Sequence, residues 1–199
     1  LVGNIDLGER TGLAGFDAFT GLRLWERPDL SFEEDLPHHA CMTPQRLVLF
    51  TAATPLDQKY PDLARKEAVK TGAFKPRAID PATGKDLIVY EEAPSYSQGD
   101  AHSNVNLVDD VLIVAARESL VVLDAATGKK RWEAKHPGMA VQFPSAADGR
   151  VICAVGKVPT AGLGHGPRRD RQIESNLNIA YDLKTGRELW RWQQKQLPI

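Results

Sequence analysis

The sequence predicts an all-β protein that is assembled from repeated hairpin units. The pattern Asp-x-x-Thr-Gly occurs four times and begins at Asp17, Asp80, Asp124 and Asp182. The eighth position after each Asp is apolar, and these positions are Trp25, Ile88, Trp132 and Trp190. Short apolar or alternating runs, as in Ser119-Leu-Val-Val-Leu, flank the pattern and are typical of strands. A pattern that recurs with one internal spacing indicates a repeat architecture.

Each repeat contains the chemistry of a tight turn. An Asp carboxylate accepts hydrogen bonds from backbone N–H groups two and three residues on, and Thr supports the same turn. Gly at the fifth position tolerates the positive φ that such a turn needs. We therefore expect strand, turn and strand, with each Trp packed between neighbouring hairpin units. The residues given this structural role are Asp17, Gly21, Trp25, Asp80, Gly84, Asp124, Gly128, Trp132, Asp182, Gly186 and Trp190.

The repeat resembles the tryptophan-docking motif of the pyrroloquinoline-quinone (PQQ) repeat β-propellers. The motif places Ala or Val before the Asp and Trp after the turn, as in Ala180-Tyr-Asp182 through Trp190. The departures are Ile88 in place of Trp and Val122 in place of Ala. The resemblance implies a β-propeller of four-stranded antiparallel blades, with a looser contact at Ile88. It predicts fold better than function, because the family includes quinoprotein dehydrogenases, an assembly lipoprotein and many secreted proteins.

The motif spacing sets the blade count. Successive Asp residues are 63, 44 and 58 positions apart, and the middle value is close to a blade of roughly 40–50 residues. The chain thus holds about three and a half blades: a partial blade at 1–28 and blades at 36–93, 100–136 and 139–195. We expect residues 1–199 to be one segment of a larger, seven- or eight-bladed propeller. The alternative is an open array whose exposed edges need a partner or a dimer.

The strands follow from apolar runs between turn signals. In the first half of the chain they are expected at 1–5, 12–16, 22–25, 38–43, 46–50, 77–79 and 85–90. In the second half they are expected at 102–108, 111–115, 120–123, 130–132, 140–143, 151–155, 176–181 and 188–192. The larger spacings come from insertions at 55–76 and 159–173. Helix formers at 62–70, followed by Gly72, predict one short surface helix.

Composition excludes several classes of protein. A net charge of −1 and a pI near 6.6 give no field that would attract nucleic acid or an anionic membrane. No apolar run approaches the ~18 residues of a membrane span. The sequence begins at Leu1 without Met or a signal peptide, so we expect a processed or excised piece of a longer protein. Cys41 and Cys153 lie in apolar runs without Cys-x-x-Cys spacing, so buried free thiols are expected.

Polar residues near the starts of the inner strands form the candidate ligand site. In a propeller the inner strands line the central channel, and both insertions open on the same face as those starts. Counting back from the following turns makes His38, His102 and Gln142 equivalent. The full candidate set at this channel mouth is His38, His39, Asp100, His102, Asn104, Gln142, His165 and Arg168. His can bind metals or move protons, but the favoured interpretation is the polar lining of a water-filled channel.

The second insertion contains alternating glycines beside His165 and Arg168. Arg can hold a carboxylate or phosphate through two hydrogen bonds. The Gly-Lys-Ser/Thr element of a P-loop is missing, however. A surface loop is the favoured interpretation.

The leading functional hypothesis is a non-catalytic interaction, scaffold or ligand-binding module. It has no catalytic residues and no cofactor, its metal content is unknown, and its partners are proteins or further blades. Its periplasmic or secreted location follows from the resemblance. The alternative is a fragment of a PQQ- and calcium-dependent dehydrogenase, which the resemblance associates with an adjacent Cys pair that is missing here. A third hypothesis is a sensor ectodomain fused to a kinase or cytochrome.

Overall fold

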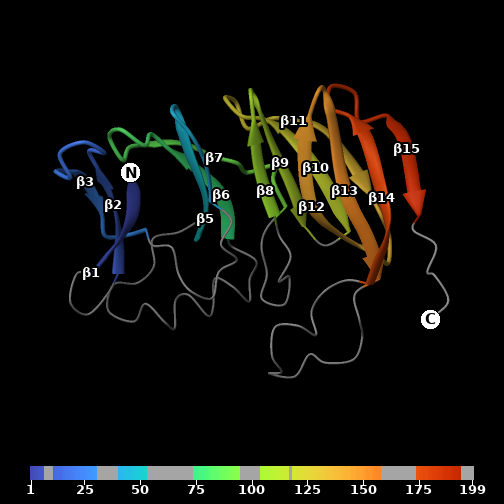
Figure 1. Ribbon diagram of the computed structural model, residues 1–199, viewed down its shortest axis with the longest axis horizontal. Coiled ribbons are helices and arrows are strands. Elements are labelled where there is room, and N and C mark those ends of the chain that lie inside the picture. The colour runs from blue at the N-terminus through green and yellow to red at the C-terminus, as the bar shows by residue number, and fades with distance from the viewer. Residues whose placement is uncertain are drawn as a thin grey trace, which may run out of the picture. The chain divides into compact units, whose positions relative to one another are not determined.

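The structure is a computed structural model that describes residues 1–6, 11–30, 40–52, 74–94, 104–116, 118–157 and 174–193 (Figure 1). Every regular element in this part of the chain is a β-strand. The predicted helix at 62–70 and both predicted insertion loops lie outside the described residues, apart from the strand ends that flank them. Among the described residues there is no helix long and apolar enough to cross a membrane.

The chain divides into two compact units after Glu91. The first unit contains two antiparallel sheets, with strand orders β1-β2-β3 and β4-β5-β6-β7. The strands of this unit are β1 (Val2–Asp6), β2 (Thr11–Phe16), β3 (Arg23–Arg27), β4 (Cys41–Thr43), β5 (Arg46–Ala52), β6 (Phe74–Ile79) and β7 (Asp86–Val89).

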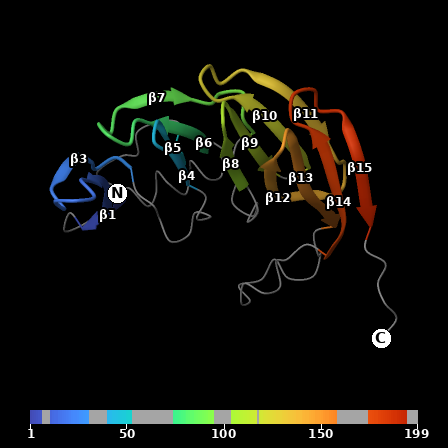
Figure 2. The same cartoon turned by 45° about the horizontal axis from the view of Figure 1, so that its top comes forward.

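The second unit contains two four-stranded antiparallel sheets, β8-β9-β10-β11 and β12-β13-β14-β15 (Figure 2). Their strands are β8 (Asn104–Val108), β9 (Val111–Ala116), β10 (Ser119–Asp124), β11 (Lys130–Lys135), β12 (Ala140–Ala147), β13 (Arg150–Lys157), β14 (Glu174–Asp182) and β15 (Glu188–Gln193). In every sheet consecutive strands pair as neighbours. The four antiparallel sheets therefore confirm the predicted all-β architecture of propeller blades.

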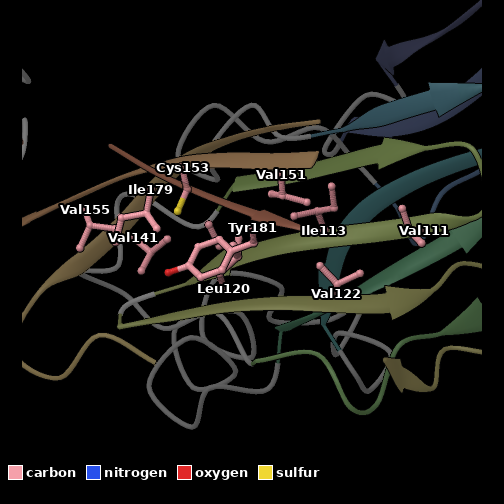
Figure 3. Packing of buried hydrophobic residues seen from close by; sticks show 11 residues of the cluster. Val111, Ile113, Leu120, Val122, Val141, Val151, Cys153, Val155, Ile179 and Tyr181 are labelled. Carbon is pink, nitrogen blue, oxygen red and sulfur yellow. The ribbon is translucent and has the colours of Figure 1, made fainter. Parts of the chain in front are cut away.

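Apolar alternation places the core of the second unit between its two sheets. On β10, Leu120 and Val122 share one face. They pack with Val151, Cys153 and Ile179 from the fourth sheet, and Figure 3 shows these side chains gathered between the strands. Full burial of such a side chain is worth about 1.5–3 kcal/mol. This packing therefore joins the third and fourth blades.

A smaller core joins the two sheets of the first unit. It contains Leu13 and Trp25 from the first sheet and Leu47, Leu49 and Ile79 from the second. Leu13 lies four residues before Asp17 and Ile79 one residue before Asp80, and Leu120 and Tyr181 stand at the same distances from Asp124 and Asp182 in the core of the second unit. The two units thus use one packing scheme, sheet face against sheet face.

Cys153 carries a free, buried thiol, as the sequence predicts, whereas Cys41 is only partly buried. Cys153 is buried in the core of the second unit, and burial raises the pKa of its thiol to about 12. The thiol is therefore neutral at physiological pH and serves as an apolar core group.

Candidate functional site

The four Asp-x-x-Thr-Gly segments form nearly identical turns. In three of them, the backbone N–H and the hydroxyl of Thr both donate to the Asp Oδ1 at 2.7–2.9 Å. In the Asp80 turn, the Ala82 N–H donates to Oδ1 at 2.8 Å. Each Gly N–H donates to the carbonyl of its Asp, and the φ of each Gly is 70–71°. The expected Asx turn with a glycine at positive φ is confirmed at all four sites.

These hydrogen bonds stabilise the ionised carboxylates. The backbone N–H of Thr20 is the main cause of the lowered pKa of Asp17, and the Thr185 hydroxyl is the main cause for Asp182. The guanidinium of Arg131 is the main cause of the strongly lowered pKa of Asp124. The motif carboxylates are therefore ionised near pH 7 and hydrogen-bonded within their own turns and strands, so they are poorly suited to accept or donate a proton.

Trp25 docks onto the turn of the next blade. Its indole N–H donates to the carbonyl of Pro81 at 2.9 Å. Its ring lies against Gly84 so closely that an added Cβ would stand 2.7 Å from the ring carbons. Trp25 is only 9% exposed. Glycine is required at position 84 both for its φ and for this close approach.

Trp132 repeats the arrangement inside the second unit. Its N–H donates to the carbonyl of Leu183 at 2.8 Å, and a Cβ on Gly186 would stand 2.7 Å from its ring. The ring also lies beside Tyr181, with centroids 5.8 Å apart. The predicted packing of a motif Trp between neighbouring hairpin units is therefore confirmed for Trp25 and Trp132.

Trp190 has no such docking partner among the described residues. It is 41% exposed, and Trp192, two positions on along β15, is 54% exposed. The register aligns Ile152, Ala180 and Trp190 across β13, β14 and β15. Because side chains alternate along a strand, this row faces away from the core row of Cys153 and Ile179. We call the side that carries Ile152, Trp190 and Trp192 the outer face of the fourth sheet.

Most of the predicted channel-mouth residues lie outside the described part of the chain. These are His38, His39, Asp100, His102, His165 and Arg168. Asn104 is the first residue of β8, and its backbone is paired with Ala115. The clustering of this set at one mouth therefore stays a prediction.

Gln142 is fully buried on β12, and neither of its amide atoms has a hydrogen-bond partner within the described part of the chain. A buried amide without partners calls for a water molecule or a ligand. Gln142 adjoins a β-bulge at Phe143, whose φ is 51°. This bulge could not be recognised from the apolar pattern.

The bulge changes the predicted equivalence between blades. Gln142 pairs with Ala154, and Asn104 pairs with Ala115. Arg150 pairs with Asp182, as Val111 does with Asp124. In the third blade, the position equivalent to Gln142 is therefore Asn104 and not His102. The extra residue in the bulge explains part of this shift from His102 to Asn104. The rest arises because counting back from the turns matched Arg150 with Asp110, whereas the strand pairing matches it with Val111.

A buried polar pair that the sequence did not reveal lies between the third and fourth blades. The hydroxyl of Tyr181 and Nε2 of His136 are 2.7 Å apart. Desolvation by burial is the main cause of the lowered pKa of His136 and of the raised pKa of Tyr181. Both side chains are therefore neutral near pH 7. The sequence shows that Tyr181 directly precedes the motif residue Asp182. It does not show the partner of Tyr181, because His136 is 45 positions away.

The described residues do not fit the PQQ and calcium site that the resemblance implies. An adjacent Cys pair is required there, yet Cys153 is packed among Leu120, Val122 and Ile179 inside the core. Across the described ranges, no three His, Cys, Asp or Glu side chains gather closely enough to hold a metal ion. We assign no step through either group.

Comparison with known proteins decides the family. A family model described as outer membrane protein assembly factor BamB matches residues 74–199, more than half of the chain. The chain belongs to this family. The PQQ-like repeat that the motifs predicted is thereby confirmed. No curated protein matches the sequence of this family member.

Solved structures share the fold of this BamB-family chain at low sequence identity. The computationally designed Ika8 protein is 11% identical with a TM-score of 0.58, covering 97% of this chain and 49% of that one. A europium-containing methanol dehydrogenase is 14% identical with a TM-score of 0.50, covering 79% and 24%. BamB from Moraxella catarrhalis is 14% identical with a TM-score of 0.49, covering 96% and 60%. The chain thus spans less than two thirds of each structure.

Proposed function

We propose that this chain is a non-catalytic interaction module that acts outside the cytoplasm, in the periplasm or after secretion. The observation that carries the proposal is how the recurrent side chains are engaged. Each motif Asp accepts hydrogen bonds from its own turn, and Trp25 and Trp132 donate to the next turn. The repeated residues thus serve blade packing. The family description, an outer membrane protein assembly factor, supports a scaffold role.

The surface best suited to a protein partner is the outer face of the fourth sheet. Trp190 and Trp192 are both substantially exposed there, beside Ile152. Contiguous exposed apolar side chains mark interaction sites, and Trp is enriched where partners bind most tightly. Protein partners, rather than nucleic acid, also suit a net charge of −1.

Site-specific photo-crosslinking tests this function. A photoreactive phenylalanine analogue at Trp192, in cells that make the protein, should give covalent adducts with a protein chain. The same analogue at Lys135, an exposed position on β11 of the same unit, is the matched control. Adducts at 192 that do not exceed those at 135 would contradict the proposal.

The second candidate is a fragment of a PQQ- and calcium-dependent dehydrogenase. The observation that favours it is the fold that 79% of this chain shares with the methanol dehydrogenase. Titrating the folded protein with PQQ, with and without calcium, and following tryptophan fluorescence separates the two functions. We expect no saturable change. Saturable quenching with a calcium-dependent midpoint would favour the dehydrogenase.

A further inference from the structure

We infer that Trp132, His136 and Tyr181 form a pH-sensitive switch at the junction of the third and fourth blades, and that acidification undocks Trp132 while each blade stays folded. We call these three residues the junction cluster. All three lie in the second compact unit. The inference goes beyond the proposed function, because it concerns how the contact between two blades is regulated.

Tyr181 contacts both other side chains of the junction cluster. Its ring centroid is 5.8 Å from that of Trp132 and 6.2 Å from that of His136. Trp132 lies on β11 and His136 follows four residues later, in the segment that leads to the fourth blade. Tyr181 directly precedes the turn that receives the indole of Trp132. One aromatic ring of the fourth blade therefore holds two side chains that come from the third.

The hydrogen bond inside the cluster requires a neutral imidazole. Among the described residues, the one acceptor for the Tyr181 hydroxyl proton is Nε2 of His136, at 2.7 Å. Tyr181 therefore donates and neutral His136 accepts. Protonation makes Nε2 a donor, so the hydrogen bond is lost in this form. His136 is 9% and Tyr181 4% exposed, and a buried charge without a partner is costly.

The charged groups that face His136 are already engaged with other partners. Glu188 and Arg191 on β15 pair with each other at 2.7 Å. The carboxylate of Glu118, whose carbonyl accepts the N–H of His136, accepts the N–H of Gly138 at 2.9 Å. Other titratable side chains on the strands of the junction are the pair Glu133 and Lys135, the buried thiol of Cys153, and Asp182, which is held by its own turn. Acidification therefore places a poorly compensated charge in the junction.

Proton linkage gives the direction of the effect. Desolvation by burial is the main cause of the lowered pKa of His136, Arg191 lowers it further, and Glu188 raises it. A hydrated His titrates near about pH 6.5. As the pH falls from there toward the pKa of the closed junction, the open form binds more protons. The ratio of open to closed junction should rise by up to about tenfold per pH unit in this window and level off below it.

Hydrogen exchange of the indole N–H groups, followed by NMR from about pH 8 to about pH 5, tests the switch on the whole chain. Trp25 is the internal control, because its indole N–H is docked on a turn in the same way. Four residues after Trp25 stands Asp29 instead of a His, and Arg27 lowers the pKa of Asp29, so it stays ionised over this range. Exchange at Trp132 should become faster relative to Trp25 on acidification.

Three variants assign the change to His136. His136→Gln should abolish it, because Gln does not titrate. Arg191→Gln keeps His136 and should make the change smaller, because a facing cation is removed; Arg191 is 60% exposed, so this variant should fold. Lys135→Gln is the matched control, since it removes an exposed cation of the same unit that does not affect the pKa of His136. It should leave the change as in the wild type.

Backbone amides of the central strands β10 and β13 show whether the opening is local. They should stay protected while the indole of Trp132 exchanges. A ratio of Trp132 to Trp25 exchange that stays constant in the wild type would overturn the inference. So would a change of the same size in His136→Gln. Parallel loss of protection in β10 and β13 would also overturn it, because the unit would then unfold as a whole.

Discussion

At the scale of the residue, a motif glycine can have two structural roles: it adopts positive φ in the turn, and it leaves room for a tryptophan ring. All four motif glycines adopt φ near 70°, and Gly84 and Gly186 also have a tryptophan ring lying against them. Positive φ could be predicted from the turn pattern, because Asp and Thr specify that turn locally. Close approach could not, because it depends on a residue more than fifty positions away.

Comparing Gly186→Ala with Gly149→Ala should distinguish the cost of positive φ from the cost of losing the close approach of the ring. The methyl group adds backbone strain of about 1–2 kcal/mol at positive φ and must also displace the ring of Trp132. We expect a loss in the free energy of unfolding that exceeds the loss for Gly149→Ala by ~1–3 kcal/mol. Urea unfolding of the two variants measures the difference. Equal losses would mean that Trp132 is not held against this turn.

His136 should make stability depend on pH. Burial lowers its pKa in the folded state, whereas in the unfolded chain it titrates near about 6.5. Between these two pKa values the unfolded state binds more protons, so stability falls as the pH falls through that window. Facing charges act too, because Arg191 lowers this pKa and Glu188 raises it.

The free energy of unfolding of wild type and His136→Gln, measured from about pH 8 down to about pH 5, tests this. The variant should lose less stability on acidification, because Gln does not titrate. Tyr181→Phe removes the hydrogen bond but leaves His136 buried, so it should keep most of the slope. A wild-type slope in His136→Gln would contradict the prediction.

At the scale of the element, the strands could be predicted well and their registers less well. Each predicted strand that falls in the described ranges is present, with ends shifted by a few residues. The bulge at Gln142 was missed, because an extra residue leaves the apolar pattern nearly unchanged while it shifts all pairing beyond it. That extra residue accounts for part of the shift in the blade equivalence on which the candidate site depended.

Trp132 should be the main side chain that fastens the third blade to the fourth. Replacing it with Ala removes a hydrogen bond to Leu183, the contact with Gly186 and the packing on Tyr181. We expect a destabilisation of about 3 kcal/mol or more, measured by chemical denaturation. Trp192→Ala, at an exposed position, should cost less than about 1 kcal/mol in the monomer. Similar losses would place both tryptophans in similar surroundings.

At the scale of the whole molecule, the described residues form two compact units, each with its own hydrophobic core. The division falls after the one motif whose docking position is Ile88 rather than Trp. An isoleucine has no N–H to donate to a turn carbonyl. The resemblance predicts a looser blade contact at this motif.

The two cores should respond to substitution separately. Leu13→Ala removes a fully buried side chain from the first unit, and Ile179→Ala does so in the second. Each should cost ~2–5 kcal/mol. Hydrogen exchange followed by mass spectrometry should show faster exchange in strands of the substituted unit only. Equal acceleration in β2 and β14 for either variant would mean that the chain opens as one cooperative unit.

The sequence by itself determined the turns, the strand order and the family, because these depend on interactions within about ten residues and on their repetition. It also determined which residues could dock. Only the tertiary structure decided which of them do so among the described residues: Trp25 docks onto the turn at Gly84, and Trp132 docks onto the turn at Gly186. The bulge at Gln142 and the pair of His136 with Tyr181 likewise depend on strands brought together by folding. Interactions between neighbouring residues specify the shape of each turn and strand, but packing between distant segments decides which turn each tryptophan contacts.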